Sequence, residues 1–153
     1  TRVRSSAASD VYKRQTLHAY SLDVATAARG FFSMKSGEIM HELAIAQSIV
    51  DVVEQRASEC QATRVKGVRL QIGEASGIVA DSLSFSFEML TGLSPRLEGA
   101  RLLIENVPHR AHCRHCAREF AVEQFIPRCP ICTEWSAEIL SGTELQILEM
   151  EIE

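Results

Sequence analysis

The chain has 153 residues, of which 46% are hydrophobic and 24% are charged, and its formal net charge is -4. This composition is typical of a soluble globular protein and excludes a chain too polar to build a core. No apolar run approaches the roughly 18 to 20 residues that a membrane-spanning helix needs, so we expect a cytoplasmic protein that does not enter a membrane.

The charge is unevenly distributed along the chain. From Met40 onward, 10 basic residues stand against 17 acidic ones, which gives this part a net charge of -7 (10 − 17). Binding to nucleic acid requires clustered cations that neutralise phosphates. The acidic body therefore argues against a nucleic-acid partner.

The first 39 residues differ from the rest of the chain. They mix Ser, Ala, Arg and Thr without a sustained apolar period. Their Arg and Ser content is typical of a transit peptide, but Asp10 and Asp23 argue against that interpretation. We expect residues 1–39 to be a disordered or non-native extension. Met40 is then the native first residue, with Met34 as the alternative start.

Apolar periodicity predicts two helices. Leu43, Ala46 and Ile49 recur at helical spacing, which predicts a helix over about 42–59. Residues 81–92 fit both a strand and a helix. We favour a helix there because Asp81 or Ser82 can cap it. Cys60, near the end of the first helix, is interpreted as an ordinary thiol.

Three strands are predicted in addition. Apolar residues alternate with polar ones from Val68 to Ile72, and Gly73 ends this half-buried strand. A second strand covers about 101–107, and a third runs from Leu145 to Ile152. The apolar parity of the third shifts between Ile147 and Leu148, which predicts either a bulge or a strand covered on both faces.

Four of the five cysteines form two CxxC pairs, at the spacing Cys113-x2-Cys116-x12-Cys129-x2-Cys132. Two intervening residues let one tight turn direct both sulfurs at a single ion, and the twelve residues between the pairs form a short hairpin. Four thiolates complete a tetrahedral zinc shell with no position left for water or substrate, which indicates a structural site. Iron in a rubredoxin-like site is the alternative, because it accepts the same ligands.

Other residues of this module have more ordinary interpretations. Phe120 and Phe125 are expected to form an apolar floor under the metal. Three histidines flank the first pair, and we interpret them as surface residues or neighbours of the ligands, with ligand exchange by one of them as the alternative. These are His109, His112 and His115. Four arginines surround the pairs and favour a zinc-ribbon protein that binds nucleic acid as a rival function: Arg110, Arg114, Arg118 and Arg128.

Met40-His41-Glu42 directly precedes the first predicted helix. By itself this triplet indicates only a helix start, with Glu42 complementing the helix dipole. Further segments follow in a fixed order. They are VRLQIGEASGIVADSL, EGARLLIE, the paired cysteines with CPIC, and SGTELQILEMEIE. Together with MHELAIAQSIV, they make residues 40–153 resemble the HypA/HybF family of nickel metallochaperones. The residues after the two cysteine pairs depart from the family, since Ala117 and Thr133 stand where glycine is usual.

The resemblance implies a function and a fold. A terminal amine, deprotonated backbone nitrogens and an imidazole suit planar Ni(II), and Met40, His41 and Glu42 are the implied nickel ligands. The implied partners are a HypB-type GTPase and the large subunit of a [NiFe]-hydrogenase, with urease accessory proteins and a homodimer as further alternatives. The implied fold is α+β, with two helices on a three-stranded sheet and an inserted zinc module.

We therefore divide the chain into an extension (1–39), an α/β nickel-binding domain (40–109 plus 137–153) and a zinc module (110–136). No nucleophile–base pair is evident, and Gly73-Glu74 followed by Gly77 lacks the lysine of a phosphate-binding loop. We expect a protein that is not an enzyme. Besides nucleic-acid binding, a zinc-stabilised protein–protein adaptor remains a rival.

Overall fold

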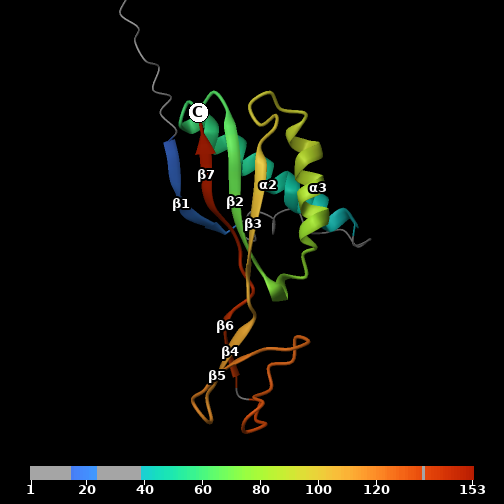
Figure 1. Ribbon diagram of the computed structural model, residues 1–153, viewed down its shortest axis with the longest axis vertical. Helices are drawn as coiled ribbons and strands as arrows, with labels where there is room; N and C mark the ends of the chain where they lie inside the picture. Colours follow the sequence, from blue (N-terminus) through green and yellow to red (C-terminus); the bar gives the residue numbers. More distant parts are fainter. Residues whose placement is uncertain (1–14, 24–38, 136) are drawn as a thin grey trace, which may run out of the picture.

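The computed structural model describes residues 15–23, 39–135 and 137–153, and it has two bodies arranged along one long axis (Figure 1). The larger body contains the helices and a four-stranded sheet of order β1-β7-β2-β3, and the smaller body contains a three-stranded sheet of order β5-β4-β6. The helical elements are α2 (Ile39–Glu59), η1 (Glu74–Ser76) and α3 (Ala80–Thr91). The larger sheet comprises β1 (Gln15–Asp23), β2 (Val65–Gly73), β3 (Arg101–Val107) and β7 (Leu145–Ile152). The smaller sheet comprises β4 (Arg110–Cys113), β5 (Glu119–Ala121) and β6 (Ala137–Ser141).

Strand directions follow from the connections. β2 and β3 are parallel, and a parallel pair requires a crossover, which η1 and α3 supply. β7 returns from the smaller body and pairs antiparallel with β2, and β1 pairs antiparallel with β7. Among the described residues, no helix is long and apolar enough to cross a membrane.

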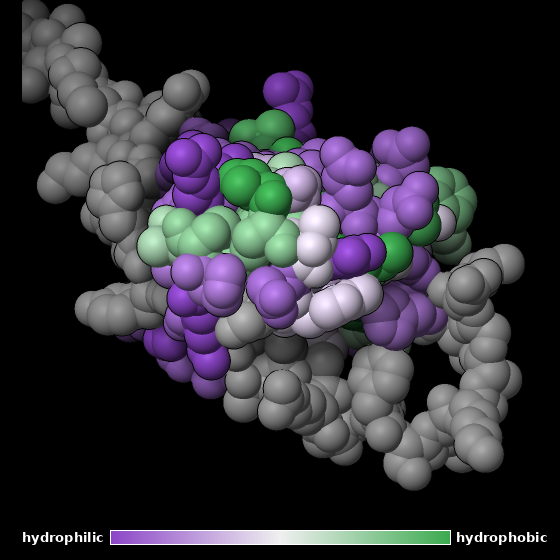
Figure 2. Space-filling view, turned by 90° about the horizontal axis from the view of Figure 1, so that it is seen from below, coloured by the Kyte–Doolittle hydropathy of each residue, from purple (hydrophilic) through white to green (hydrophobic). Residues whose placement is uncertain are grey.

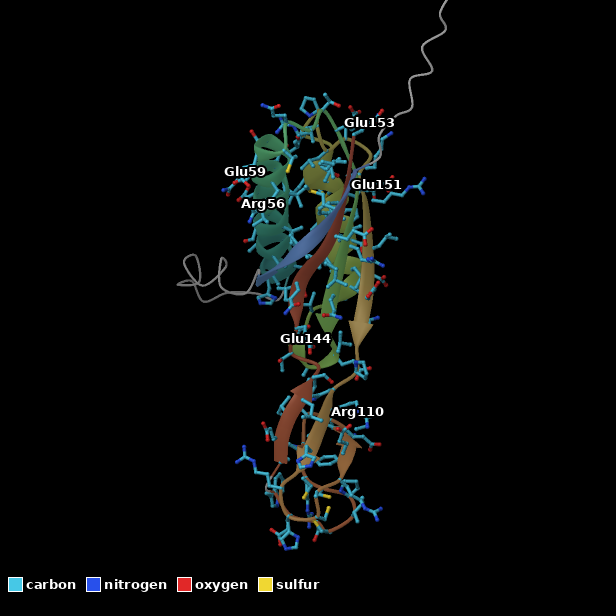
Figure 3. All side chains as sticks on the ribbon, turned by 90° about the vertical axis from the view of Figure 1, so that its left-hand side faces the viewer. Arg56, Glu59, Arg110, Glu144, Glu151 and Glu153 are labelled. Carbon is cyan, nitrogen blue, oxygen red and sulfur yellow. The ribbon has the colours of Figure 1, made fainter. Side chains whose placement is uncertain are left out.

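The core of the larger body lies between the helices and one face of the sheet. Alternation along β2 points Val68, Leu70 and Ile72 to the buried face. The helices bury their own apolar side chains against this face, including Ile49, Val53, Leu83 and Phe87. Truncating one of these side chains to alanine costs about 2–5 kcal/mol, because a cavity adds to the lost burial. Figure 3 shows α2 to one side of the sheet.

The other face of the sheet is polar. Arg69 on β2 forms ion pairs with Glu105 on β3, at 3.2 Å, and with Glu149 on β7. These side chains are partly exposed, so each pair contributes about 0–1 kcal/mol. Because one face is apolar and the other charged, the sheet is covered by helices on one side only.

The expected bulge in the last strand is confirmed. Arg69 of β2 pairs with Glu149, whereas the next residue, Leu70, pairs with Ile147. Leu148 is therefore the extra residue that shifts the apolar parity. Both helices are also confirmed, although α2 begins three residues before the predicted start.

Two expectations need correction. The three expected strands are present, but the sheet has a fourth, β1, formed by residues 15–23 of the expected extension. The free edge of β7 offers unpaired backbone groups, and Gln15–Asp23 contains no Gly or Pro that would prevent pairing. Residues 1–14 and 24–38 of the extension, Met34 among them, lie outside the described residues, and Ile39 begins α2. In addition, β6 pairs with β4, so residues 137–141 belong to the sheet of the metal module and not to the α/β domain.

Candidate metal centre

Each CxxC pair lies in a tight turn of the same construction. In the first turn, the Cys113 N–H donates to Arg118 O at 2.8 Å and the Ala117 N–H donates to Cys113 O at 2.9 Å. In the second turn, the Cys129 N–H donates to Glu134 O at 3.0 Å and the Thr133 N–H donates to Cys129 O at 2.9 Å. The two turns therefore present their sulfurs in equivalent ways.

The two residues that follow the pairs have left-handed backbones. Ala117 has φ 58° and Thr133 has φ 63°. Glycine adopts this region freely, whereas a Cβ there costs roughly 1–2 kcal/mol, and a β-branched residue such as Thr is especially unfavourable. The departures at these two positions thus impose backbone strain without displacing the cysteines.

The four sulfurs form one cluster at the end of the smaller body, where Figure 3 shows the sulfur atoms together. All four Sγ atoms lie within 4.8 Å of one another. The Cys113–Cys132 pair is separated by 3.5 Å and the Cys116–Cys129 pair by 3.6 Å. A tetrahedral ion with Zn–S bonds of about 2.3 Å holds its sulfurs about 3.8 Å apart. The donor set and its spacing therefore fit a tetrahedral ion with soft ligands.

The pKa values of the clustered thiols shift in different directions. Backbone N–H donation from Cys132 is the largest influence on Cys129 and lowers its pKa to about 6. Burial raises the pKa of Cys116. The Glu134 N–H lowers the pKa of Cys132, but burial and the neighbouring thiols outweigh it and raise that pKa to about 12. Without a cation the cluster does not hold four negative charges, and a divalent ion supplies the missing positive charge.

A small apolar core supports the cluster. Phe120 is buried together with Ala111, Val122 and two of the cysteines, as expected for a floor under the metal. The same expectation is wrong for Phe125, which is exposed. Gln124 and Phe125 both have positive φ, and this turn directs the Phe125 ring outward, 6.4 Å from the ring of His109.

None of the three flanking histidines belongs to the cluster within the part of the chain that the structure describes. His109 is buried at the junction of the two bodies, His112 is half-buried on β4, and His115 is exposed in the first turn.

Seen from the end of the metal module, hydrophobic residues occupy the middle of the surface and hydrophilic ones surround them (Figure 2).

Three of the four arginines around the cluster have partners within the module. Arg110 lies 3.7 Å from Glu119, and Arg114 lies 3.8 Å from Glu138. Arg128 donates to Thr133 O and lies over the ring of Trp135. Because carboxylates and a carbonyl already engage these cations, they offer weak support for binding phosphate.

The junction of the two bodies is closely packed, which the sequence did not predict. The His109 N–H donates to a carboxylate oxygen of Glu74 at 2.9 Å. A Cβ on Gly73 would lie 2.1 Å from the backbone of Gly142, and one on Gly142 would lie 2.5 Å from Cα of His109. Glu144 accepts from the Gly142 N–H, and Figure 3 shows Glu144 at this junction. The backbones at Gly73, His109 and Gly142 therefore lie so close together that neither glycine position has room for a side chain.

Met40, His41 and Glu42 lie in the first turn of α2. His41 is half-buried, and Glu42 is buried. Glu42 accepts a hydrogen bond of 3.3 Å from the N–H of Val79, the residue that precedes α3. Val79 has no side-chain oxygen to cap that helix, so Glu42 supplies the negative charge that complements its N-terminus.

Comparison with known proteins decides the family. Residues 40–152 match the family model described as "Hydrogenase/urease nickel incorporation, metallochaperone, hypA". The hydrogenase maturation factor HypA of Geobacter metallireducens is 43% identical over 114 residues, which are 74% of this chain and 100% of that protein. The HypA of Streptomyces avermitilis is 47% identical over 117 residues, 74% of this chain and 88% of that protein. The chain belongs to the HypA family.

Solved HypA structures have the same fold. The solution structure of the Ni metallochaperone HypA from Helicobacter pylori is 24% identical, with a TM-score of 0.53 over 72% of this chain and 96% of that one. A second HypA solution structure is 25% identical, with a TM-score of 0.57 over 74% and 97%. HypA proteins are non-catalytic metallochaperones that act in nickel incorporation. The match begins at Met40, so the four clustered cysteines and the Met-His-Glu triplet lie within the HypA region.

Proposed function

We propose that this chain carries Ni(II) on Met40, His41 and Glu42 and delivers it during maturation of a [NiFe]-hydrogenase. The observation that carries the proposal is the position of this triplet in the first turn of α2, inside the region that matches the HypA family. The first four N–H groups of a helix have no intrahelical acceptor. Their nitrogens can lose protons and bind a metal without breaking the helix.

The donor set suits planar nickel. His41 supplies an imidazole, and backbone nitrogens of the same turn complete a planar chelate. Met40 supplies an amine only in a chain that begins at Met40. The Glu42 carboxylate is buried and accepts from the Val79 N–H, which supports a backbone nitrogen, rather than the carboxylate, as the contribution of Glu42.

In this proposal the four cysteines hold a structural zinc ion. Cys113, Cys116, Cys129 and Cys132 would occupy all four tetrahedral positions, which leaves none for water or substrate. Zinc would stabilise the small module, whose apolar core consists of few residues. The role of zinc is then to keep this module folded.

The proposed partners are those that the family implies. A HypB-type GTPase would act with this chain in the cytoplasm, and the large subunit of a [NiFe]-hydrogenase would receive the nickel. Urease accessory proteins are alternative recipients, since the family description names both enzymes. A homodimer is compatible with this role.

The proposal is tested by nickel binding to His41→Ala, made in a chain that begins at Met40 and measured by equilibrium dialysis. We expect tight nickel binding to be lost, because the planar chelate requires the imidazole, while zinc content stays at about one per chain. Glu42→Gln is the matched comparison, and it should keep most of the affinity because its backbone nitrogen remains. Undiminished nickel binding by His41→Ala would remove the chemical basis of the proposal and favour a zinc-stabilised adaptor.

A further inference from the structure

Strand β3 is a free edge of the larger sheet. Within the described part of the chain the strand order is β1-β7-β2-β3, so β3 pairs with β2 on one side and leaves its other side unpaired. A hollow of about 620 Å³ lies between β3 and α3, lined by Phe87 and Thr91 of the helix and by residues 99–103. The helix therefore leaves the first half of β3 uncovered. Such an edge offers backbone N–H and C=O groups to a further strand.

The side chains of β3 give this edge little protection. Alternation along the strand places Arg101, Leu103 and Glu105 on the polar face of the sheet. Natural edge strands commonly avoid pairing by carrying Lys, Pro or a bulge, and β3 contains none of the three. Between its two charged residues it exposes an apolar side chain, because Leu103 has an exposed fraction of 59%. The edge is therefore suited to pairing with a strand that covers Leu103.

The charges on this face are not fully paired within one copy. Arg69 is shared between two carboxylates, Glu105 at 3.2 Å and Glu149. No ion pair within the described residues includes Arg101, although Glu88 of α3 lines the same hollow. Among these residues, one copy therefore supplies neither a carboxylate for Arg101 nor a second cation for Glu105.

The order of the residues along β3 is self-complementary. In an antiparallel pair of strands, residues directly opposite each other lie on the same face of the sheet. Two copies of β3 related by a two-fold axis at Leu103 would place Arg101 of each copy opposite Glu105 of the other. The apolar residues would also face one another, Leu103 opposite Leu103 and Leu102 opposite Ile104. An axis at Leu102 or Ile104 would instead place Leu103 opposite a charged residue, so the sequence favours a single register.

We propose that two copies of this chain associate through β3, in an antiparallel strand pair centred on Leu103 that joins their two sheets. The interface contains two Arg101–Glu105 pairs, and each Glu105 then has a cation on both sides, Arg69 of its own copy and Arg101 of the other. A strand of another protein would find the same backbone groups, but the symmetry of the charges about Leu103 matches a second copy. The inference goes beyond the proposed function, because it does not depend on nickel binding.

This arrangement has consequences for the metal modules and for the hollow. β3 leads directly to β4 and the cysteine cluster (Figure 1), so an antiparallel pair directs the two metal modules away from each other. Ile104 of the second copy lies opposite Leu102, beside the hollow that Phe87 lines, and buries apolar surface there. Because a strand pair is a small interface, we expect association that depends strongly on protein concentration.

The test measures the mass of the full chain by sedimentation equilibrium over a range of protein concentrations. The parent should be a mixture of monomer and dimer. Arg101→Glu should weaken dimerisation at least about tenfold, because the two-fold axis sets like charges opposite each other twice. Glu105→Arg should weaken it for the same reason. Leu103→Lys should also weaken dimerisation, since it places two cations at the axis.

A mixture of the two charge variants tests the register itself. Arg101→Glu has carboxylates at both positions and Glu105→Arg has cations at both, so each repels itself while the two complement each other. The mixture should therefore form heterodimers with an affinity near that of the parent. Damage to the fold would not produce this recovery, and circular dichroism and zinc content would show that each variant is folded. Arg56→Glu is the matched control, because it reverses an exposed charge on α2, and it should dimerise as the parent does.

Three results would overturn the inference. A parent chain that stays monomeric at every concentration would exclude a second copy and leave the edge to a strand of another protein. Parent-like dimerisation of both single charge variants would place the contact elsewhere on the molecule. Failure of the two folded variants to associate with each other would exclude the register centred on Leu103. Nickel binding should be equal in all variants, so the nickel measurements decide the proposed function independently.

Discussion

Replacing the two left-handed residues of the cysteine turns by glycine should strengthen zinc binding. Ala117 and Thr133 have φ near 60°, where a Cβ costs roughly 1–2 kcal/mol. Glycine removes this cost but gives the unfolded chain back about 0.5–1 kcal/mol of conformational freedom. The net gain is about 0.5–1 kcal/mol at each position, with the larger share at Thr133 because its side chain is β-branched.

This gain should be measurable as zinc affinity. Metal binding and folding of so small a module are coupled, so strain in the folded turns lowers the apparent affinity. Relief of about 1–2 kcal/mol in the double variant corresponds to about 5- to 30-fold tighter binding. Competition with a chromogenic chelator would compare the parent, Ala117→Gly, Thr133→Gly and the double variant.

A matched control lies outside the metal module. Gln61 also has a positive φ, 55°, and Gln61→Gly should raise the thermal midpoint of the α/β body without changing zinc affinity. The reasoning would be refuted if both turn variants bound zinc no more tightly than the parent, or if Gln61→Gly changed zinc affinity as much as they do.

Three other predictions follow from the metal module and the junction. Cys113→Ala should lose the zinc and unfold the module, while circular dichroism still shows the helices of the body; retained zinc would exclude Cys113 as a ligand. Gly142→Ala should lower the free energy of unfolding by about 1–3 kcal/mol, because the new Cβ would overlap His109; an unchanged urea midpoint would contradict the close packing. The pKa values of Cys116 and Cys132 are raised, so both thiols are protonated at neutral pH and zinc must displace at least two protons. Apparent zinc affinity should therefore fall as pH falls, and calorimetry in buffers of different ionisation enthalpy would measure the protons released; release of none would refute the assignment.

Local patterns predicted the metal cluster and the main elements. Each CxxC turn is formed by a few consecutive residues, so the spacing of the cysteines predicts the geometry of the turn without knowledge of the fold. The bulge could also be predicted, because the alternation of apolar and polar residues along β7 changes phase between Ile147 and Leu148. Ala117 and Thr133 were recognised as departures from glycine, and their positive φ explains why glycine suits these positions.

Features that depend on distant contacts escaped prediction. Strand β6 has no buried alternation, since Ile139 and Leu140 are both exposed, and only its pairing with β4 defines it. The contact between Gly73 and Gly142 joins residues far apart in the sequence, and so does the hydrogen bond from Val79 to Glu42. Local periodicity contains no information about such pairs.

The most direct test of the account is a nickel titration of the chain that begins at Met40 beside the chain that begins at Thr1. In the first, the Met40 nitrogen is an amine that can bind nickel, whereas in the second it is an amide within a helix that begins at Ile39. Zinc content, measured in parallel, should be the same in both. The account predicts distinctly tighter nickel binding by the shorter chain, weakening as pH falls because amine and imidazole must lose protons to bind. Equal nickel affinity in the two chains would contradict a site built on the Met40 amine.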